Sequence, residues 1–279
     1  MRVELTIVTG LVLGLGIAAF QRNFAWKDGI SLWSDVVEKS PQKARPHYNL
    51  GHHFIKSGNY DRAVREYNKA LSLFPNYVDA HNGLGLAYYN KGLYKKAIQK
   101  YKDALRIDKN FFQAHYNLGI IYLRQGLFDK AISENRKVLE LRPFDVEARY
   151  NLAAAYGGKG LTDQAIAEYQ KVLELDPDNA DVFYNLGTAF KKKEMYGHAV
   201  RLFEKTVQLK PDDVEAHLEL ANLYLHKIKD RKKALFHYRR VLTIDPAHQS
   251  APKIRKMMRA RQPCAVKSPS KTGNASSID

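Results

Sequence analysis

Residues 49–75, NLGHHFIKSGNYDRAVREYNKALSLFP, contain a pattern that recurs along most of the chain. The first half holds a leucine, a small residue and an aromatic spaced i, i+1 and i+4, and the second half holds an alanine, an aromatic and an alanine spaced i, i+4 and i+7. These positions are Leu50, Gly51, Phe54, Ala63, Tyr67 and Ala70. Both spacings place apolar side chains on one face of a helix. Gly58, between the two halves, suits the left-handed residue that ends a helix, so the stretch predicts two amphipathic helices joined by a tight turn.

The pattern returns in steps of 34 residues, as from Leu50 to Leu84. Its anchor recurs as Asn49-Leu50-Gly51, Gly83-Leu84-Gly85, Asn117-Leu118-Gly119, Asn151-Leu152-Ala153 and Asn185-Leu186-Gly187. A helical hairpin of this size cannot bury its apolar face alone, so neighbouring hairpins must stack. The sequence therefore predicts an all-α fold, an α-solenoid.

These residues resemble the tetratricopeptide repeat (TPR) family, and the resemblance covers residues 44–248. It implies six helix-turn-helix repeats and, in the family, a concave groove lined by the first helix of each pair. The repeats would span 44–77, 78–111, 112–145, 146–179, 180–213 and 214–248. Four departures are visible. Lys109 stands where the other repeats close on proline, and Asn135 stands at an aromatic position, which predicts a thinner core there. Glu194 replaces a turn glycine, and one residue is inserted within 226–233. The insertion predicts a longer loop between two intact helices.

The repeats are flanked by two candidate capping helices. Residues 22–43 are interpreted as a linker and a half-repeat helix with Leu32 and Trp33 facing inward. Residues 249–261 predict a basic capping helix, because Ile254, Met257 and Met258 are spaced i, i+3 and i+4. Residues 262–279 lack periodicity and predict a disordered tail.

Residues 1–21 form a separate hydrophobic segment with sixteen uncharged residues, 5–20. As a helix this run spans about 24 Å, slightly short of a hydrocarbon core about 30 Å thick. Three interpretations stay open: a transmembrane or anchor helix, a secretory signal peptide, and a buried helix. The anchor is preferred, and Gly10 and Gly14 form a GxxxG pair suited to packing between membrane helices.

The junction that follows this segment has a second resemblance. Its motifs are Arg22-Asn23, Trp26-Lys27-Asp28, Leu32-Trp33, Ser40-Pro41 and Ala44-Arg45. They resemble the junction in polytopic membrane glycosyltransferases of the transmembrane and TPR-containing O-mannosyltransferase type. The resemblance implies an accessory or C-terminal module that presents acceptor polypeptides, with repeats on the extracytoplasmic side of the membrane. A cytoplasmic location is the alternative.

No motif for catalysis, a metal or a cofactor rises above background, so we expect neither an enzyme nor a cofactor. One cysteine, Cys264, excludes an internal disulfide and a cysteine-based zinc site. Histidines recur at His47, His81, His115 and His217, but equivalent positions in stacked repeats lie about 10 Å apart, too far to share a metal ion.

The candidate site is a row of asparagines and tyrosines on the first helix of each repeat. Its members are Asn49, Asn82, Asn117, Asn151, Asn185, Tyr48, Tyr116, Tyr150 and Tyr184. The row resembles the asparagine ladder of the O-GlcNAc transferase superhelix, which in that family grips the backbone of an extended peptide. An amide offers both a donor and an acceptor to a peptide unit. We therefore expect a protein or peptide partner. The alternative is that these residues only tie adjacent helices together.

The formal charge of +16 is concentrated near the C-terminus, where residues 227–271 hold fourteen Lys and Arg against two Asp. The candidate basic patch is Lys229, Arg231, Lys232, Lys233, Arg239, Arg240, Lys253, Arg255, Lys256 and Arg259. It suits anionic lipid. Nucleic acid is not favoured, because no recognition-helix pattern accompanies the charge. A soluble adaptor with a basic end, and a solvated end without a partner, remain alternatives.

Overall fold

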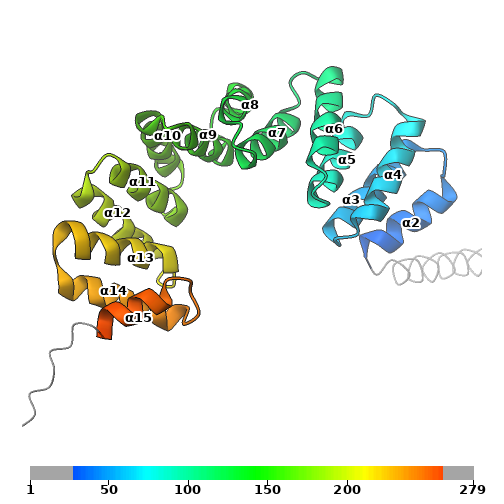
Figure 1. Cartoon of the computed structure of the whole chain (residues 1–279). Helices are drawn as coiled ribbons and strands as arrows, with labels where there is room; N and C mark the ends of the chain where they lie inside the picture. The colour runs from blue at the N-terminus through cyan, green and yellow to red at the C-terminus, as the bar shows by residue number, and fades with distance from the viewer. Residues whose placement is uncertain (1–27, 260–279) are drawn as a thin grey trace, which may run out of the picture. The chain divides into compact units, whose positions relative to one another are not determined.

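The computed structural model describes residues 28–259, and that range is entirely helical, with fourteen α-helices, one π-helix and no strand (Figure 1). The helices belong to two compact units, which meet between Leu175 and Asp176 in the sequence. Each unit is an array of stacked helical hairpins, so the predicted all-α solenoid fold is confirmed.

The first unit contains one single helix followed by four hairpins. Its helices are α2 (Gly29–Lys39), α3 (Ala44–Lys56), α4 (Tyr60–Leu73), α5 (Val78–Asn90), α6 (Tyr94–Ile107), α7 (Phe112–Arg124), α8 (Phe128–Leu141), α9 (Val146–Lys159) and α10 (Thr162–Leu175). The first and second helices of each hairpin pack together, and each second helix packs against the next first helix, as α4 does against α5.

The second unit contains two hairpins and a final helix. Its elements are α11 (Ala180–Lys192), α12 (Tyr196–Leu209), α13 (Val214–Leu223), the π-helix η1 (Tyr224–Ile228), α14 (Arg231–Ile244) and α15 (Ala251–Arg259). The helix α11 packs on α12, α12 on α13, α13 on α14 and α14 on α15.

The turns inside the hairpins have the predicted left-handed residue. Gly58 has a φ of 74° and Gly160 has a φ of 86°, the region that costs glycine least. Glu194 occupies the same place in its hairpin with a φ of 60°. The backbone of this turn is therefore set by the packing of the two helices, even where glycine is absent.

Each second-helix aromatic fills a space that small first-helix residues leave open. Tyr67 is 1% exposed, and a Cβ built on Gly83 would lie 2.6 Å from its ring carbon Cζ. At the same position of the third hairpin, Asn135 is fully buried and donates from Nδ2 to the carbonyl of Ala131 at 2.8 Å, while its Oδ1 has no partner. The predicted weak point of the core is thus a polar one.

The longer loop expected in the last hairpin is not found. The inserted residue is absorbed by η1, which extends α13 by a wide helical turn, and Lys229 then ends it with a φ of 68°. Asp230 caps α14 by accepting from the backbone N–H of Lys233 at 3.0 Å. The π-turn holds the inserted residue within the helix and keeps Tyr224 buried in the core.

The two single helices cover the ends of their units. Ile30, Trp33 and Val37 of α2 pack on the core of the first hairpin, whereas Leu32 is half-buried outside that cluster. On α15, Ile254 is buried and the two methionines Met257 and Met258 pack against the core of the second unit.

The predicted hydrophobic helix of residues 1–21 and the predicted tail of residues 262–279 lie outside the described residues. Between residues 28 and 259, every helix is too short or too polar to cross a membrane. The anchor therefore stays a prediction from the sequence.

Candidate functional site

The first helices of the first unit are neighbours: α3 contacts α5, α5 contacts α7, and α7 contacts α9. The asparagines and tyrosines singled out above stand on these helices and on α11, and we call this side of each unit the first-helix face. Its members Tyr48, Asn49, Asn82, Tyr116, Asn117, Tyr150, Asn151, Tyr184 and Asn185 are all half-buried.

Polar side chains of this face bond across neighbouring first helices of the first unit. Asn117 Nδ2 donates to Asn82 Oδ1 at 3.0 Å. Burial raises the pKa of Tyr116, and its hydrogen bond with Asn151 opposes that rise. Asn185 also has a partner. An amide has two donor hydrogens and two lone pairs, so one such bond leaves capacity for a ligand. The row thus ties the helices together and keeps surplus polar groups.

The tyrosines of the face pack their rings on the aromatic core beneath. The centroid of Tyr48 lies 5.8 Å from that of Tyr67, and Tyr184 lies 5.4 Å from Phe203. These pairs are nineteen residues apart, from the first helix to the second helix of one hairpin. The spacing of nineteen residues is visible in the sequence. Whether it brings two rings into contact depends on the angle at which the two helices of the hairpin pack.

The second unit adds negative charge to its part of the face. Burial, followed by the charges of Glu219, Glu215 and Asp213, raises the pKa of Tyr184 to about 12. Glu219 stands one repeat after Asn185, and Lys191 Nζ lies 2.7 Å from both of its carboxylate oxygens. An ion pair between α11 and α13 therefore follows the last asparagine of the row.

In the first, third and last hairpins, the recurring histidine bridges the first helix to the loop before it and to the second helix of the same hairpin. His115 Nε2 donates to the carbonyl of Lys109 at 3.0 Å, and its Nδ1 lies 2.6 Å from Glu134 Oε2. The hydrogen bond to Glu134 raises the pKa of His115. No group of three His, Cys, Asp or Glu within residues 28–259 could hold a metal ion.

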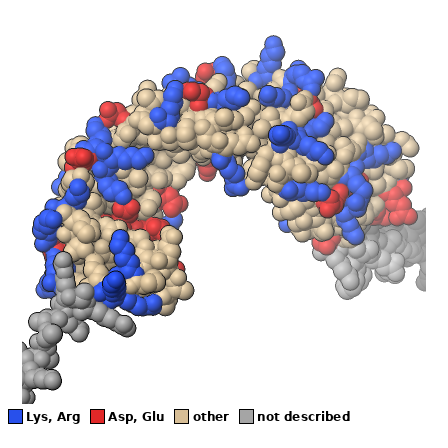
Figure 2. All heavy atoms as spheres, viewed as in Figure 1, with Lys and Arg blue, Asp and Glu red and all other residues tan. Residues whose placement is uncertain are grey.

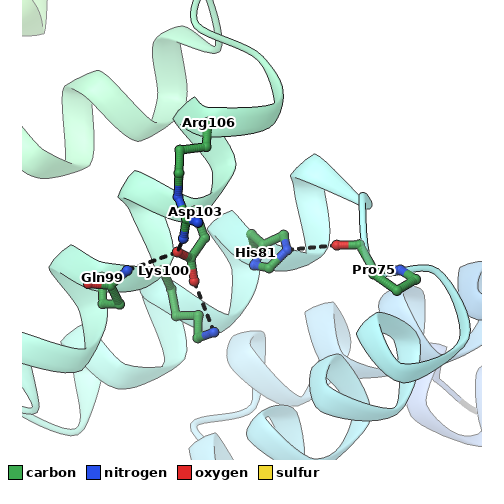
Figure 3. Close-up of polar contacts among 6 residues, drawn as sticks. All are labelled: Pro75, His81, Gln99, Lys100, Asp103 and Arg106. Atoms are coloured by element: carbon green, nitrogen blue, oxygen red, sulfur yellow. Dashed lines mark hydrogen bonds and ion pairs between the residues drawn. The ribbon is translucent and has the colours of Figure 1, made fainter.

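The second hairpin breaks this arrangement, as Figure 3 shows. His81 donates from Nε2 to the carbonyl of Pro75 at 2.9 Å, but its buried Nδ1 has no partner. Lys100 stands where the first, third and fourth hairpins carry Glu66, Glu134 and Glu168. Its Nζ instead pairs with Asp103 at 3.0 Å. Gln99 and Arg106 also donate to Asp103. These contacts satisfy the carboxylate of Asp103, whereas Nδ1 of His81 has no hydrogen-bond partner.

In the last hairpin two buried histidines face each other. His217 Nδ1 lies 2.8 Å from His237 Nδ1, and His217 Nε2 lies 3.0 Å from the carbonyl oxygen of Pro211. A carbonyl only accepts, so His217 carries its proton on Nε2 and His237 donates from Nδ1. Burial lowers the pKa of His237 to about 4. Both rings are therefore neutral at pH 7.

The basic residues predicted as a patch are distributed over α14, α15 and Lys229 at the end of η1. Figure 2 shows lysine and arginine side chains interspersed with other residues on this part of the second unit. Arg231 and Arg239 are separated by about 12 Å along the α14 axis. Several of the group have partners of their own: Arg240 donates to Asp212 at 3.2 Å, and Arg255 donates to the carbonyl of Pro246 at 2.8 Å. The side chain of Arg259 lies outside the described residues.

Stacked helical hairpins with left-handed turns, small first-helix residues and aromatic second-helix residues define a helical-repeat protein. Three family models for tetratricopeptide repeats match the chain, one at residues 48–110 and 184–248, another at 91–156 and a third at 159–194. The chain belongs to the tetratricopeptide repeat family. None of these matches includes the glycosyltransferase-like junction at residues 22–45, and nothing in the comparisons supports that resemblance.

Solved structures share this fold. YrrB, described as a TPR protein with an unusual peptide-binding site, is 28% identical, with a TM-score of 0.59 over 71% of this chain and 97% of YrrB. MamA from Desulfovibrio magneticus RS-1 is 25% identical, with a TM-score of 0.58 over 61% of this chain and 96% of MamA. Pseudomonas aeruginosa PilF is 20% identical, with a TM-score of 0.66 over 77% of this chain and 97% of PilF, and shows the fold alone. A search of the curated proteins finds no match.

Proposed function

We propose that this chain is a non-catalytic scaffold that binds an extended peptide segment of a partner protein along its first-helix face. The observation that carries the proposal is the row of half-buried asparagines on adjacent first helices of the first unit. Asn117 and Asn82 of this row bond each other and retain further donors and acceptors. The similarity to YrrB, whose description includes a peptide-binding site, points in the same direction.

The bonds inside the row make it suited to a backbone ligand. The bond between Asn82 and Asn117 holds the two side chains in one geometry before a partner arrives, which lowers the entropy lost on binding. Half-buried tyrosines beside the amides supply apolar contact area at low entropic cost. Such a surface would bind an extended chain with little regard to its side chains.

The test is a triple variant within the first unit, Asn82→Ala, Asn117→Ala and Asn151→Ala. Peptides are first selected from a random library displayed on phage against the wild-type chain, and their affinities are then measured by fluorescence anisotropy. At about 1 kcal/mol for each lost hydrogen bond, we expect affinity to fall about 100-fold. Asn68→Ala, on the exposed side of α4, is the matched control and should bind as wild type does. Equal affinities for the triple variant and the control, with helicity unchanged, would refute the proposal.

A further inference from the structure

A cavity of about 330 Å³ lies in the second unit, between α13, η1, α14 and α15. Leu218, Ile254 and Met257 form its apolar wall, and Asn222, His226 and Lys253 are polar residues that line it. A concave apolar site with a few convergent polar groups is the usual form of a ligand pocket. We call this cavity the terminal pocket.

The terminal pocket continues the first-helix face of its unit. Leu218 stands 34 residues after Tyr184, at the same position of the next hairpin. Asn222 and His226 follow it at i+4 and i+8, on the same side of α13 and η1. A peptide lying along this face would reach the pocket at its end.

The pocket offers donors and no negative charge. Asn222 Oδ1 already accepts from the Tyr238 hydroxyl at 2.8 Å, so the amide faces a ligand with its Nδ2 hydrogens. Lys253 is exposed and forms no ion pair within residues 28–259, and no Asp or Glu lines the cavity. The half-buried amide of Asn222 and the ammonium group of Lys253 can both donate to a carboxylate. A ligand with a carboxylate beside an apolar group therefore matches both the polar and the apolar wall of the pocket.

The pocket also coincides with the one irregular helix of the described range. His226 belongs to η1, the π-turn that takes up the inserted residue of the last hairpin. Single π-turns inside α-helices are frequent at functional sites, because they redirect side chains that a regular helix would present elsewhere. Here the insertion builds part of the pocket wall.

We propose that the terminal pocket anchors the bound peptide by one aliphatic side chain, with a neighbouring carboxylate of the same peptide on Lys253 and on Asn222 Nδ2. This inference rests on the proposed function and names the kind of segment that the second unit selects. Leu218, Ile254 and Met257 contact the aliphatic group, and the two donors fix the acidic residue beside it.

Methionine methyl resonances give a local test, because the chain has four methionines and only Met257 lines the pocket. The full chain, labelled with ¹³C at the methionine methyls, is titrated with the capped peptide Gly-Ser-Leu-Glu-Ser-Gly. Versions with serine for the leucine or glutamine for the glutamate are titrated in parallel, as is hexanoate. We expect the Leu-Glu peptide to move the Met257 signal saturably, with each altered peptide at least about five-fold weaker. Met195, on an exposed turn, should not move.

Paired variants identify the groups that bind the carboxylate. Lys253→Ala should weaken the Leu-Glu peptide about five- to ten-fold, whereas Lys256→Ala removes the same charge from α15 outside the pocket and should leave binding unchanged. Asn222→Asp keeps an acceptor for Tyr238 but places a carboxylate in the pocket, so binding should fall more than about ten-fold.

Three results would overturn the inference. The first is an immobile Met257 signal at about 5 mM peptide, where a site with a Kd of about 1 mM would be mostly occupied. The second is an equal effect of Lys253→Ala and Lys256→Ala, and the third is hexanoate binding as tightly as the peptide. The triple asparagine variant separates the two proposals. If only the first-helix face fails, that variant binds phage-selected peptides as wild type does, while the Met257 response to the Leu-Glu peptide persists.

Discussion

The buried histidine pair of the last hairpin predicts that this unit loses stability as the pH falls below neutrality. His237 is 7% exposed, and burial, followed by the charge of His217, lowers its pKa to about 4. The charge of Lys233, on the same helix, also lowers the pKa of His237, whereas the charge of Glu204 on α12 raises it. The pKa of His217 is also lowered, first by burial and then by Arg240, against the favourable charges of Asp213 and Asp212.

The sign and size follow from proton linkage. A histidine whose folded pKa lies below its unfolded value of about 6.5 binds fewer protons when folded, so the free energy of unfolding decreases as the pH falls from about 6.5 to about 4. Between pH 7.5 and pH 5, the His237 shift amounts to about 2 kcal/mol. Well below pH 4, His237 is protonated in both the folded and the unfolded chain, so it no longer makes the free energy of unfolding depend on pH.

Urea unfolding followed by circular dichroism at pH 7.5 and pH 5 measures this loss. His237→Gln is the reference, because glutamine does not titrate and every other group is common to both proteins. The wild type should lose about 2 kcal/mol more than His237→Gln over this interval. Identical pH dependence in the two proteins would refute the reasoning.

A second variant reverses the sign. His237→Glu places opposite His217 the residue type that His115 already faces in Glu134. That hydrogen bond raises the pKa of His115, and a raised pKa gives stability that is present below about pH 6.5 and lost as the pH rises through the folded value. His237→Glu should therefore become more stable, relative to His237→Gln, as the pH falls from 7.5 to 5.5.

Two further predictions concern the first unit. Lys100→Glu should supply an acceptor for a proton on His81 Nδ1 when the ring is doubly protonated, because Nε2 already donates to Pro75. A double-mutant cycle with His81→Phe, each corner measured by urea unfolding at about pH 5.5, should give a favourable coupling of about 1 kcal/mol, whereas zero coupling would contradict it. Gly85→Ala should destabilise the chain by about 1–2 kcal/mol, because the new Cβ would lie 2.5 Å from Cε1 of the buried Tyr101. Gly157→Ala, also inside a first helix, is its control: the nearest atom is 3.8 Å away, so unfolding should show no loss.

The fold could be predicted because the repeat records both local and long-range information. The spacing of Leu50, Gly51 and Phe54 sets one helix face, and a period of 34 residues reports that every hairpin meets the same neighbours. The left-handed φ of Glu194 shows how strongly this frame acts, since the hairpin closes there without the favoured glycine.

The polar contacts between helices were harder to foresee. His115 and Glu134 are nineteen residues apart, as are Tyr48 and Tyr67, so the signal was present as a fixed offset from the first helix to the second. Its meaning depends on the angle at which the hairpin closes, which periodicity along one helix does not contain. The π-turn was missed for a related reason: an inserted residue can enter a loop or a helix, and burial of Tyr224 decides between them.

In the proposed binding mode, the amides of the first-helix face both tie neighbouring helices together and bind the peptide, so the two roles compete for the same atoms. If the bond between Asn82 and Asn117 broke on binding, a ligand would gain only the difference between two similar hydrogen bonds. A peptide that used the remaining donors and acceptors would keep the helices tied and add bonds of its own. The proposed binding mode therefore requires that the peptide extend the amide row rather than replace its internal bonds, so affinity along this row should be modest. The terminal pocket, whose Lys253 forms no ion pair within residues 28–259, is where selectivity can be gained.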